Sequence, residues 1–159
     1  MTKKTIPSVL FICTGNICRS PTAEGVLRKR AAEQGVAVQV DSAGTHGYHV
    51  GEPPDPRSVR AAAQRGYDIS GIRARKLGHG DFADYDYVVA LDEGHLEIMR
   101  RVCPPEQQHK LFAMMAFAPH LGHTEVPDPY YGPPQGFEQV LDLLEEASEG
   151  LLAELLRRP

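Results

Sequence analysis

The sequence predicts one α/β domain, residues 1–159, in which a four-stranded, mainly parallel sheet is doubly wound with helices on both faces. A chain of 159 residues with 42% hydrophobic residues has enough apolar side chains for one core and too few residues for a second domain. Short apolar runs typical of strands alternate with segments of helical periodicity. This alternation implies right-handed crossovers between parallel strands.

The first half of the chain begins with a predicted strand over residues 9–13, Val-Leu-Phe-Ile-Cys, which breaks at residues 14–16. Ser20 is expected to cap the following helix, Pro21 to occupy its first position, and Gly35 to end it. The other elements of this half are a strand over 38–43, a loop rich in Gly and Pro over 44–56, and a helix over 56–66.

The second half continues the alternation. Its predicted elements are a buried strand over 85–91, a helix over 93–102, a last strand over 110–115, and a proline-rich loop over 122–136. A closing helix carries its apolar residues on one face, at Phe137, Val140, Leu141, Leu144, Leu151, Leu152 and Leu155.

The loop Cys-Thr-Gly-Asn-Ile-Cys-Arg-Ser, residues 13–20, follows the first strand directly. In doubly wound sheets the ligand site lies beyond the carboxyl ends of the strands, which is the position of this loop. Consecutive backbone N–H groups at a helix N-terminus can bind a phosphate dianion, and Gly15 and Asn16 are residue types that tolerate the positive φ such a curl needs. We therefore expect a substrate-binding nest formed by Thr14, Gly15, Asn16, Ile17, Cys18 and Ser20.

Two side chains supply chemistry within this loop. Arg19, six residues after Cys13, can bind two phosphate oxygens with its planar guanidinium. The positive potential of the loop N–H groups and of Arg19 also favours the thiolate of Cys13, which is the nucleophilic form of the side chain. The Ser20 hydroxyl can donate a hydrogen bond to that sulfur. The loop is not a nucleotide P-loop, because no Gly-Lys-Ser/Thr follows it.

A general acid must come from outside the loop, since the leaving oxygen of a phosphate ester needs a proton. Asp128 is the candidate: it lies between two prolines in Val-Pro-Asp-Pro-Tyr-Tyr-Gly, residues 126–132. An Asp-Pro pair is also typical of an ordinary turn. The two aromatic residues that follow, Tyr130 and Tyr131, favour the catalytic interpretation.

With these motifs together, the sequence resembles the low-molecular-weight protein tyrosine phosphatases over essentially its full length. The likeness rests on residues 13–21, on Asp-Ser-Ala-Gly-Thr at 41–45 and on Asp-Pro-Tyr-Tyr at 128–131. The resemblance implies that the chain hydrolyses a phosphotyrosine protein or a small aryl phosphate through a phosphocysteine, uses no cofactor, and is inhibited by phosphate-like oxyanions. It makes Cys13 the nucleophile, Arg19 the phosphate clamp, and Asp128 the general acid and then base.

The resemblance also implies supporting roles. Asn16 and Ser42 would brace the loop, while aromatic rings would wall the cleft around a substrate ring, namely Tyr48, Tyr130 and Tyr131. The sequence departs from the family pattern at Tyr48, where Trp is frequent, and at Ile72, where a His often precedes the retained Arg75. These departures concern substrate preference and not the reaction type.

Two other functions fit part of the sequence. Thioredoxin-coupled arsenate reductases resemble the same loop but use a relay of two further cysteines, and only Cys103 follows Arg75 here. A non-catalytic phosphotyrosine-binding module would keep Arg19 but would need neither Cys13 nor Asp128. The histidines do not indicate a metal site, because no cysteine pair with zinc-type spacing accompanies the pairs His46/His49 and His120/His123.

The three cysteines, with no segment apolar enough for a signal-peptide core or a membrane span, predict a cytoplasmic protein with free thiols. Cys18 lies five residues after Cys13 and has two possible roles: it traps oxidised Cys13 as a disulfide, or it only fills space beneath the loop. The net charge is −4. We expect no nucleic-acid or membrane partner, and a monomer or weak dimer.

Overall fold

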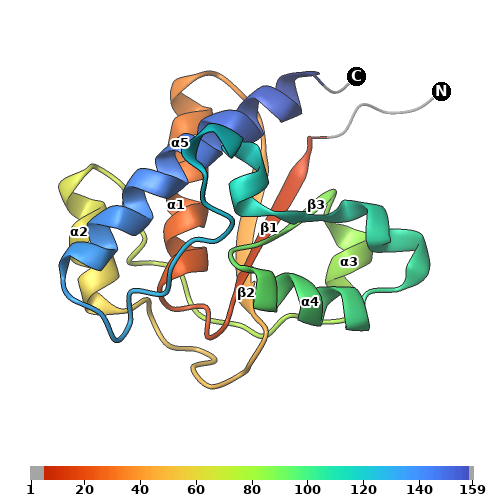
Figure 1. Ribbon diagram of the computed structural model, residues 1–159, viewed down its shortest axis with the longest axis horizontal. Helices are drawn as coiled ribbons and strands as arrows, with labels where there is room; N and C mark the ends of the chain where they lie inside the picture. Colours follow the sequence, from red (N-terminus) through yellow and green to blue (C-terminus); the bar gives the residue numbers. More distant parts are fainter. Residues whose placement is uncertain (1–5, 158–159) are drawn as a thin grey trace.

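The computed structural model describes residues 6–157 and has at its centre one sheet of four strands, all parallel, in the order β2-β1-β3-β4 (Figure 1). The strands are β1 Ser8–Cys13, β2 Gln39–Gly44, β3 Tyr87–Ala90 and β4 Leu111–Ala113. The ends of the expected domain, residues 1–5 and 158–159, lie outside the described residues.

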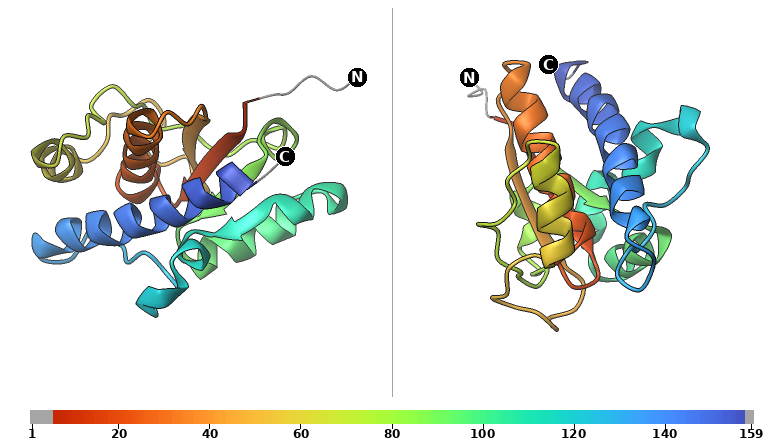
Figure 2. Two further views of the ribbon diagram at one scale, coloured as in Figure 1. Left: turned by 90° about the horizontal axis from the view of Figure 1, so that it is seen from above. Right: turned by 90° about the vertical axis from the view of Figure 1, so that its left-hand side faces the viewer.

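Helices cover both faces of this sheet, as predicted. They are α1 Arg19–Glu33, α2 Pro56–Gln64, α3 Asp81–Asp84, α4 Glu93–Val102 and α5 Gln135–Arg157, with short 3-10 turns η1 Pro105–Lys110, η2 Met114–Phe117 and η3 Pro119–Leu121. In Figure 1, α1, α2 and α5 lie on the left of the sheet and α3 and α4 on the right. Figure 2 shows the same layers from two further directions. No helix within residues 6–157 is long and apolar enough to cross a membrane.

Alternation along β1 divides the core between the two faces. All six residues of β1 are buried. Val9, Phe11 and Cys13 face the cluster formed with α1 and α5, whereas Leu10 and Ile12 face the cluster formed with α3 and α4. A strand that is apolar on both sides suits only the interior of a covered parallel sheet. This position fixes the end of β1 firmly and with it Cys13.

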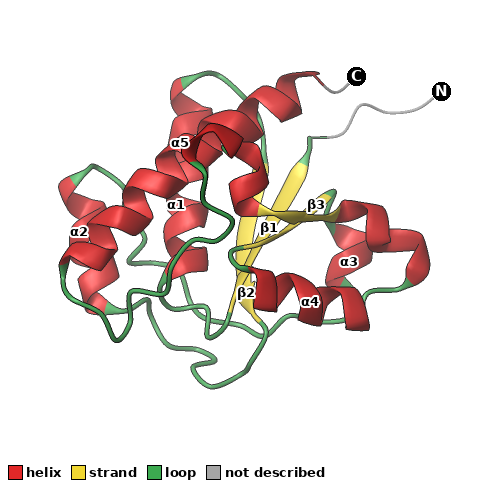
Figure 3. Cartoon of the chain, viewed as in Figure 1, coloured by secondary structure: helices red, strands yellow, loops and turns green. Residues whose placement is uncertain are grey.

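The loops that follow β1, β2 and β3 lie at the carboxyl ends of the strands, in the lower half of Figure 3. Gly44 ends β2 against the first of these loops, and a Cβ atom there would lie 2.6 Å from the backbone oxygen of Thr14. The backbone N–H of Thr45 donates to the oxygen of Cys13 at 2.8 Å. The glycine therefore permits a backbone contact that holds the loop in place.

Some local expectations are wrong. Helix α1 begins at Arg19 rather than after a Ser20 cap, its N-cap residue is Cys18, and no side chain caps it. Ser20 does not act as a cap because its hydroxyl turns toward Cys13 and Asn16 instead. The last strand is shorter than predicted, since residues 114–117 form a 3-10 turn. Helix α3 was not foreseen because four residues are too few for a periodic pattern.

Candidate active site

Cys13 is the last residue of β1, and its side chain is held at the carboxyl edge of the sheet. Only 3% of the residue is exposed. The loop that leaves it runs into α1 after five residues, so that backbone N–H groups and the positive end of the helix dipole face the region above the sulfur. Asn16 has a φ of 60°, as expected for this curl.

A chain of hydrogen bonds supports the loop from below. Asn16 Nδ2 donates to Ser20 Oγ at 2.8 Å and to Ser42 Oγ at 2.9 Å, and Asn16 Oδ1 accepts from the backbone N–H of Arg75 at 2.9 Å. Ser42 Oγ donates in turn to the buried carboxylate of Glu24 at 2.6 Å. Because both polar atoms of the Asn16 side chain have partners, this buried network fixes one conformation of the loop.

Arg19 is 4% exposed, and its guanidinium donates hydrogen bonds through one nitrogen, Nη1. Its Nη1 donates to Asp92 Oδ2 and to the carbonyl oxygen of Val126, both at 2.9 Å. Burial opposes ionisation of Asp92, but the backbone N–H of His95 and the Arg19 guanidinium outweigh it and lower the pKa of this carboxyl. Arg19 Nη2 lies 3.7 Å from Asp128 Oδ2. Neither Nη2 nor Nε makes a hydrogen bond within the described residues, so both remain available to an anion.

These groups open into one hollow of about 350 Å³ at the carboxyl edge of the sheet. Asp128 borders it from an exposed loop, where its Oδ1 accepts from the backbone N–H of Tyr130 at 3.0 Å. The residues that line the hollow are Cys13, Thr14, Gly15, Ile17, Cys18, Arg19, Tyr48, His49, Asp128, Tyr130 and Tyr131. A thiol, a cation and a carboxylate therefore share one hollow with three tyrosine rings.

Residues 8–158 match the model of the family described as low molecular weight phosphotyrosine protein phosphatase. The chain belongs to this family. A low molecular weight protein-tyrosine-phosphatase from Streptomyces coelicolor is 47% identical over 150 residues, covering 91% of each chain. The crystal structure of a protein tyrosine phosphatase from Entamoeba histolytica, with Hepes in its active site, superposes with a TM-score of 0.91 at 39% identity over 94% of this chain and 97% of that one.

A more distant neighbour is Wzb from Vibrio vulnificus in complex with benzylphosphonate. It is 27% identical, with a TM-score of 0.82 over 94% of this chain and 99% of that one. The family, the full coverage and the four-stranded fold together make this chain a protein tyrosine phosphatase. The reductase and the non-catalytic module considered from the sequence are thereby set aside.

Most of the substrate-contact residues predicted for this phosphatase line the hollow, but Asn16 and Ser20 do not, because their side chains lie beneath the loop. Gly15 also differs from expectation: only Asn16 in the loop has a positive φ. At Gly15 a Cβ atom would lie 2.9 Å from His49 Cδ2, so the glycine is explained by close packing rather than by backbone conformation.

The sequence did not single out several residues that complete the phosphatase site. His49, expected to be an ordinary loop histidine, lines the hollow. Asp92 and His95 lie at the start of α4, next to Arg19 and Thr14 respectively. Asp92 could have been found from its position directly after β3, since the strand ends share one edge. Glu24, in contrast, lies on a helix face and gives no sequence signal of its contact with Ser42.

Cys103, His46 and His120 do not line the hollow. Cys103 is buried in the cluster between the sheet and α4, on the opposite face from Cys13. His46 stacks on Tyr48 with ring centroids 5.0 Å apart, and His120 contacts Glu146. Within residues 6–157 no group of His, Cys, Asp and Glu side chains is arranged to hold a metal ion.

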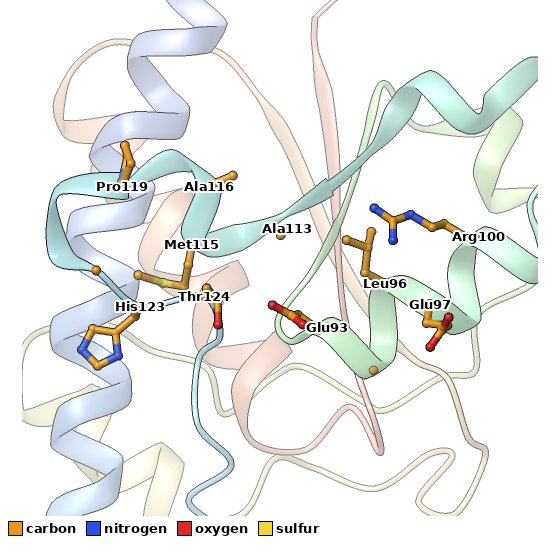
Figure 4. Close-up of a pocket in the computed structure, with 12 residues that line it drawn as sticks. Glu93, Leu96, Glu97, Arg100, Ala113, Met115, Ala116, Pro119, His123 and Thr124 are labelled. Atoms are coloured by element: carbon orange, nitrogen blue, oxygen red, sulfur yellow. The ribbon is translucent and has the colours of Figure 1, made fainter.

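A second hollow of about 800 Å³ lies between α4 and residues 113–124 (Figure 4). Glu93, Leu96, Glu97 and Arg100 line it from α4, and His123 and Thr124 line it from the opposite side. None of the site residues predicted from the sequence borders it. The smaller hollow, which contains the thiol, is therefore the candidate active site.

Proposed function

We propose that the phosphatase hydrolyses aryl phosphate monoesters, phosphotyrosine above all, through a covalent phosphocysteine at Cys13. The observation that carries this assignment is that Cys13, Arg19 and Asp128 border one hollow of about 350 Å³. Cys13 supplies the nucleophile, Arg19 binds the equatorial oxygens, and Asp128 handles the protons.

The reaction then has two steps. In the first, the sulfur of Cys13 attacks phosphorus, the phosphorus–oxygen bond to the substrate breaks, and the leaving phenolate takes a proton from Asp128. In the second, the Asp128 carboxylate takes a proton from a water molecule, which attacks the phosphocysteine and releases inorganic phosphate. The loop N–H groups and the free donors of Arg19 stabilise the oxygens of the transferring group in both steps.

The tyrosine walls support an aryl substrate. Tyr130 is half-buried and meets Tyr131 edge-on with ring centroids 4.8 Å apart, while Tyr48 and Tyr131 are 70% and 92% exposed. Exposed rings from two separate loops can contact a flat substrate ring. The benzylphosphonate bound by the Wzb neighbour is an aryl compound with a phosphate-like group, which supports this substrate class and inhibition by phosphate-like oxyanions.

Cys13→Ser tests the assignment of the nucleophile. A serine hydroxyl is far less ionised than a cysteine thiol, so turnover of phosphotyrosine should fall to nearly zero while vanadate still binds. Activity of the parent protein should be unchanged by a chelator. Full turnover by a stringently purified Cys13→Ser protein would contradict the assignment.

A thiol nucleophile also needs a reducing compartment, which supports a cytoplasmic location.

A further inference from the structure

His95, in the first turn of α4, makes a contact with the phosphate-binding loop that the proposed reaction does not use. Its ring Nε2 lies 2.8 Å from Thr14 Oγ1. Thr14 directly follows the nucleophile, and its backbone oxygen lies against Gly44. His95 is 4% exposed and does not line the hollow. The imidazole therefore touches the loop from behind, where substrate does not reach.

The other side of the same ring faces the carboxylate that holds Arg19. His95 Nδ1 lies 3.0 Å from Asp92 Oδ1, without hydrogen-bond geometry, and the backbone N–H of His95 donates to that oxygen at 2.8 Å. Asp92 Oδ2 accepts from Arg19 Nη1 at 2.9 Å. A proton on Nδ1 is favourable beside this carboxylate, so Nε2 is the acceptor for the Thr14 hydroxyl.

The surroundings keep this imidazole neutral. Burial lowers the pKa of His95 to about 4, and the nearby positive charges of Arg19 and His46 act in the same direction, whereas Asp92 and Asp128 oppose them. A neutral ring can accept from Thr14, whereas a protonated ring cannot. At neutral pH the link from Thr14 to Asp92 is therefore intact.

We propose that His95 is a positioning residue for phosphate binding, which aligns the start of the loop with the Arg19 guanidinium by holding Thr14 and Asp92 together. The inference rests on the proposed role of Arg19 as the phosphate clamp. It gives the loop a second brace from α4, opposite the one that Ser42 and Asn16 supply from the side of β2. Both braces converge on residues that separate the nucleophile from the clamp.

A double-mutant cycle between Thr14 and His95 tests this role, with inorganic phosphate as a competitive inhibitor. Thr14→Val removes the hydroxyl and should raise the inhibition constant about fivefold, the usual effect of one lost hydrogen bond. Thr14→Ser keeps the hydroxyl, so its inhibition constant should equal that of the parent protein. His95→Asn removes Nε2 and should raise the inhibition constant as much as Thr14→Val does. Adding Thr14→Val to His95→Asn should not raise the inhibition constant further.

His95→Gln keeps an amide near the position of Nε2 and should retain most of the phosphate affinity. His123→Asn, at an exposed site away from the loop, is the matched control and should leave the inhibition constant unchanged. If His95→Asn does not fold, Thr14→Val alone still tests the inference, because an inhibition constant equal to that of Thr14→Ser would show that this hydrogen bond does not position the loop.

Two results would overturn the inference: multiplicative effects of Thr14→Val and His95→Asn on the inhibition constant, or loss of unfolding free energy with unchanged phosphate affinity. Arg19→Ala separates this failure from failure of the proposed function. If Arg19→Ala weakens phosphate binding strongly while Thr14 and His95 show no coupling, only the role of His95 is wrong. If Arg19→Ala does not change phosphate binding, Arg19 is not the phosphate clamp, and the inference about His95 is then wrong as well.

Discussion

Ser20 Oγ lies 2.9 Å from Cys13 Sγ and accepts a hydrogen bond from Asn16 Nδ2 at 2.8 Å. Because Asn16 occupies an acceptor site of the hydroxyl, the Ser20 proton is free to point at the sulfur. A hydrogen bond to a thiolate is charge-assisted, and such bonds are stronger than neutral ones. The geometry thus supports the role of Ser20 that was predicted from the sequence.

Ser20→Ala should lower kcat/KM at neutral pH by roughly 10- to 100-fold, since a hydrogen bond to a charged group contributes about 1.5–3 kcal/mol. The rate of Cys13 alkylation by iodoacetamide reports the thiolate directly and should fall in parallel. Ser148→Ala is a matched control, because this buried serine lies on α5 and its hydroxyl has no partner within the described residues. Unchanged alkylation in Ser20→Ala would show that Ser20 does not stabilise the thiolate.

Asp128→Asn should lower kcat/KM for phosphotyrosine, which reports the first step alone, by roughly 10²- to 10⁴-fold, the usual range for a general acid. The loss should be smaller for p-nitrophenyl phosphate, whose leaving group needs no proton. Glu125 lies on the same segment, and its carboxylate accepts from the backbone N–H of Glu93, so Glu125→Gln should keep most of the activity. An equal loss for both substrates would make Asp128 a residue that positions substrate.

Peroxide should inactivate the phosphatase in a way that dithiothreitol reverses, through Cys18. Peroxide converts the Cys13 thiolate to a sulfenic acid, and the Cys18 thiol then displaces water to form a disulfide. Burial raises the pKa of Cys18 to about 12, against the effect of the Ser58 hydroxyl. Since the thiolate is the attacking form, disulfide formation should be slow at neutral pH and faster as the pH rises.

Cys18→Ser should recover poorly after peroxide, because its sulfenic acid oxidises further, whereas Cys103→Ser should recover like the parent. Bound phosphate should slow inactivation of all three proteins by covering Cys13. Equal recovery of Cys18→Ser and the parent, with no Cys13–Cys18 linkage in peptide mass mapping, would leave Cys18 as a packing residue.

The free energy of unfolding should decrease as the pH falls from about 6.5 to about 4. In this window the unfolded chain protonates His95, whose ordinary pKa is 6.5, while the folded chain, with a pKa of about 4, does not. The lowered pKa of Asp92 acts with the same sign at lower pH. Urea unfolding at several pH values should show a shallower dependence for His95→Gln than for the parent and for His123→Gln. Parallel curves for all three proteins would exclude His95 as the source.

The sequence predicts candidate site residues where they belong to distinctive segments of the chain. Cys13 and Arg19 belong to one loop between a strand and a helix, and Asp128 lies in a distinctive proline-flanked segment. The fold class could be predicted for a similar reason, because alternating strands and helices have few allowed topologies. Residue type allowed a positive φ at both Gly15 and Asn16, but only Asn16 has one.

The residues that were missed act through contacts between distant elements. Glu24 meets Ser42 because α1 packs over β2, and His95 meets Thr14 because β3 lies beside β1 in the sheet. No periodicity or spacing in a single sequence encodes such contacts. Ser20 was predicted to cap α1 because serine is typical of that position, but its hydroxyl contacts the sulfur of Cys13 instead.

Trapping the phosphoenzyme tests the central claim most directly. In Asp128→Ala the second step lacks its base, so p-nitrophenyl phosphate should still phosphorylate the enzyme while hydrolysis of the intermediate slows. Acid quenching after a few seconds, followed by peptide mass mapping, should then place the phosphate on the peptide that contains Cys13, and the label should be absent from Cys13→Ser. Phosphate on another residue, or turnover with no covalent phosphate on Cys13 at any time, would contradict the account.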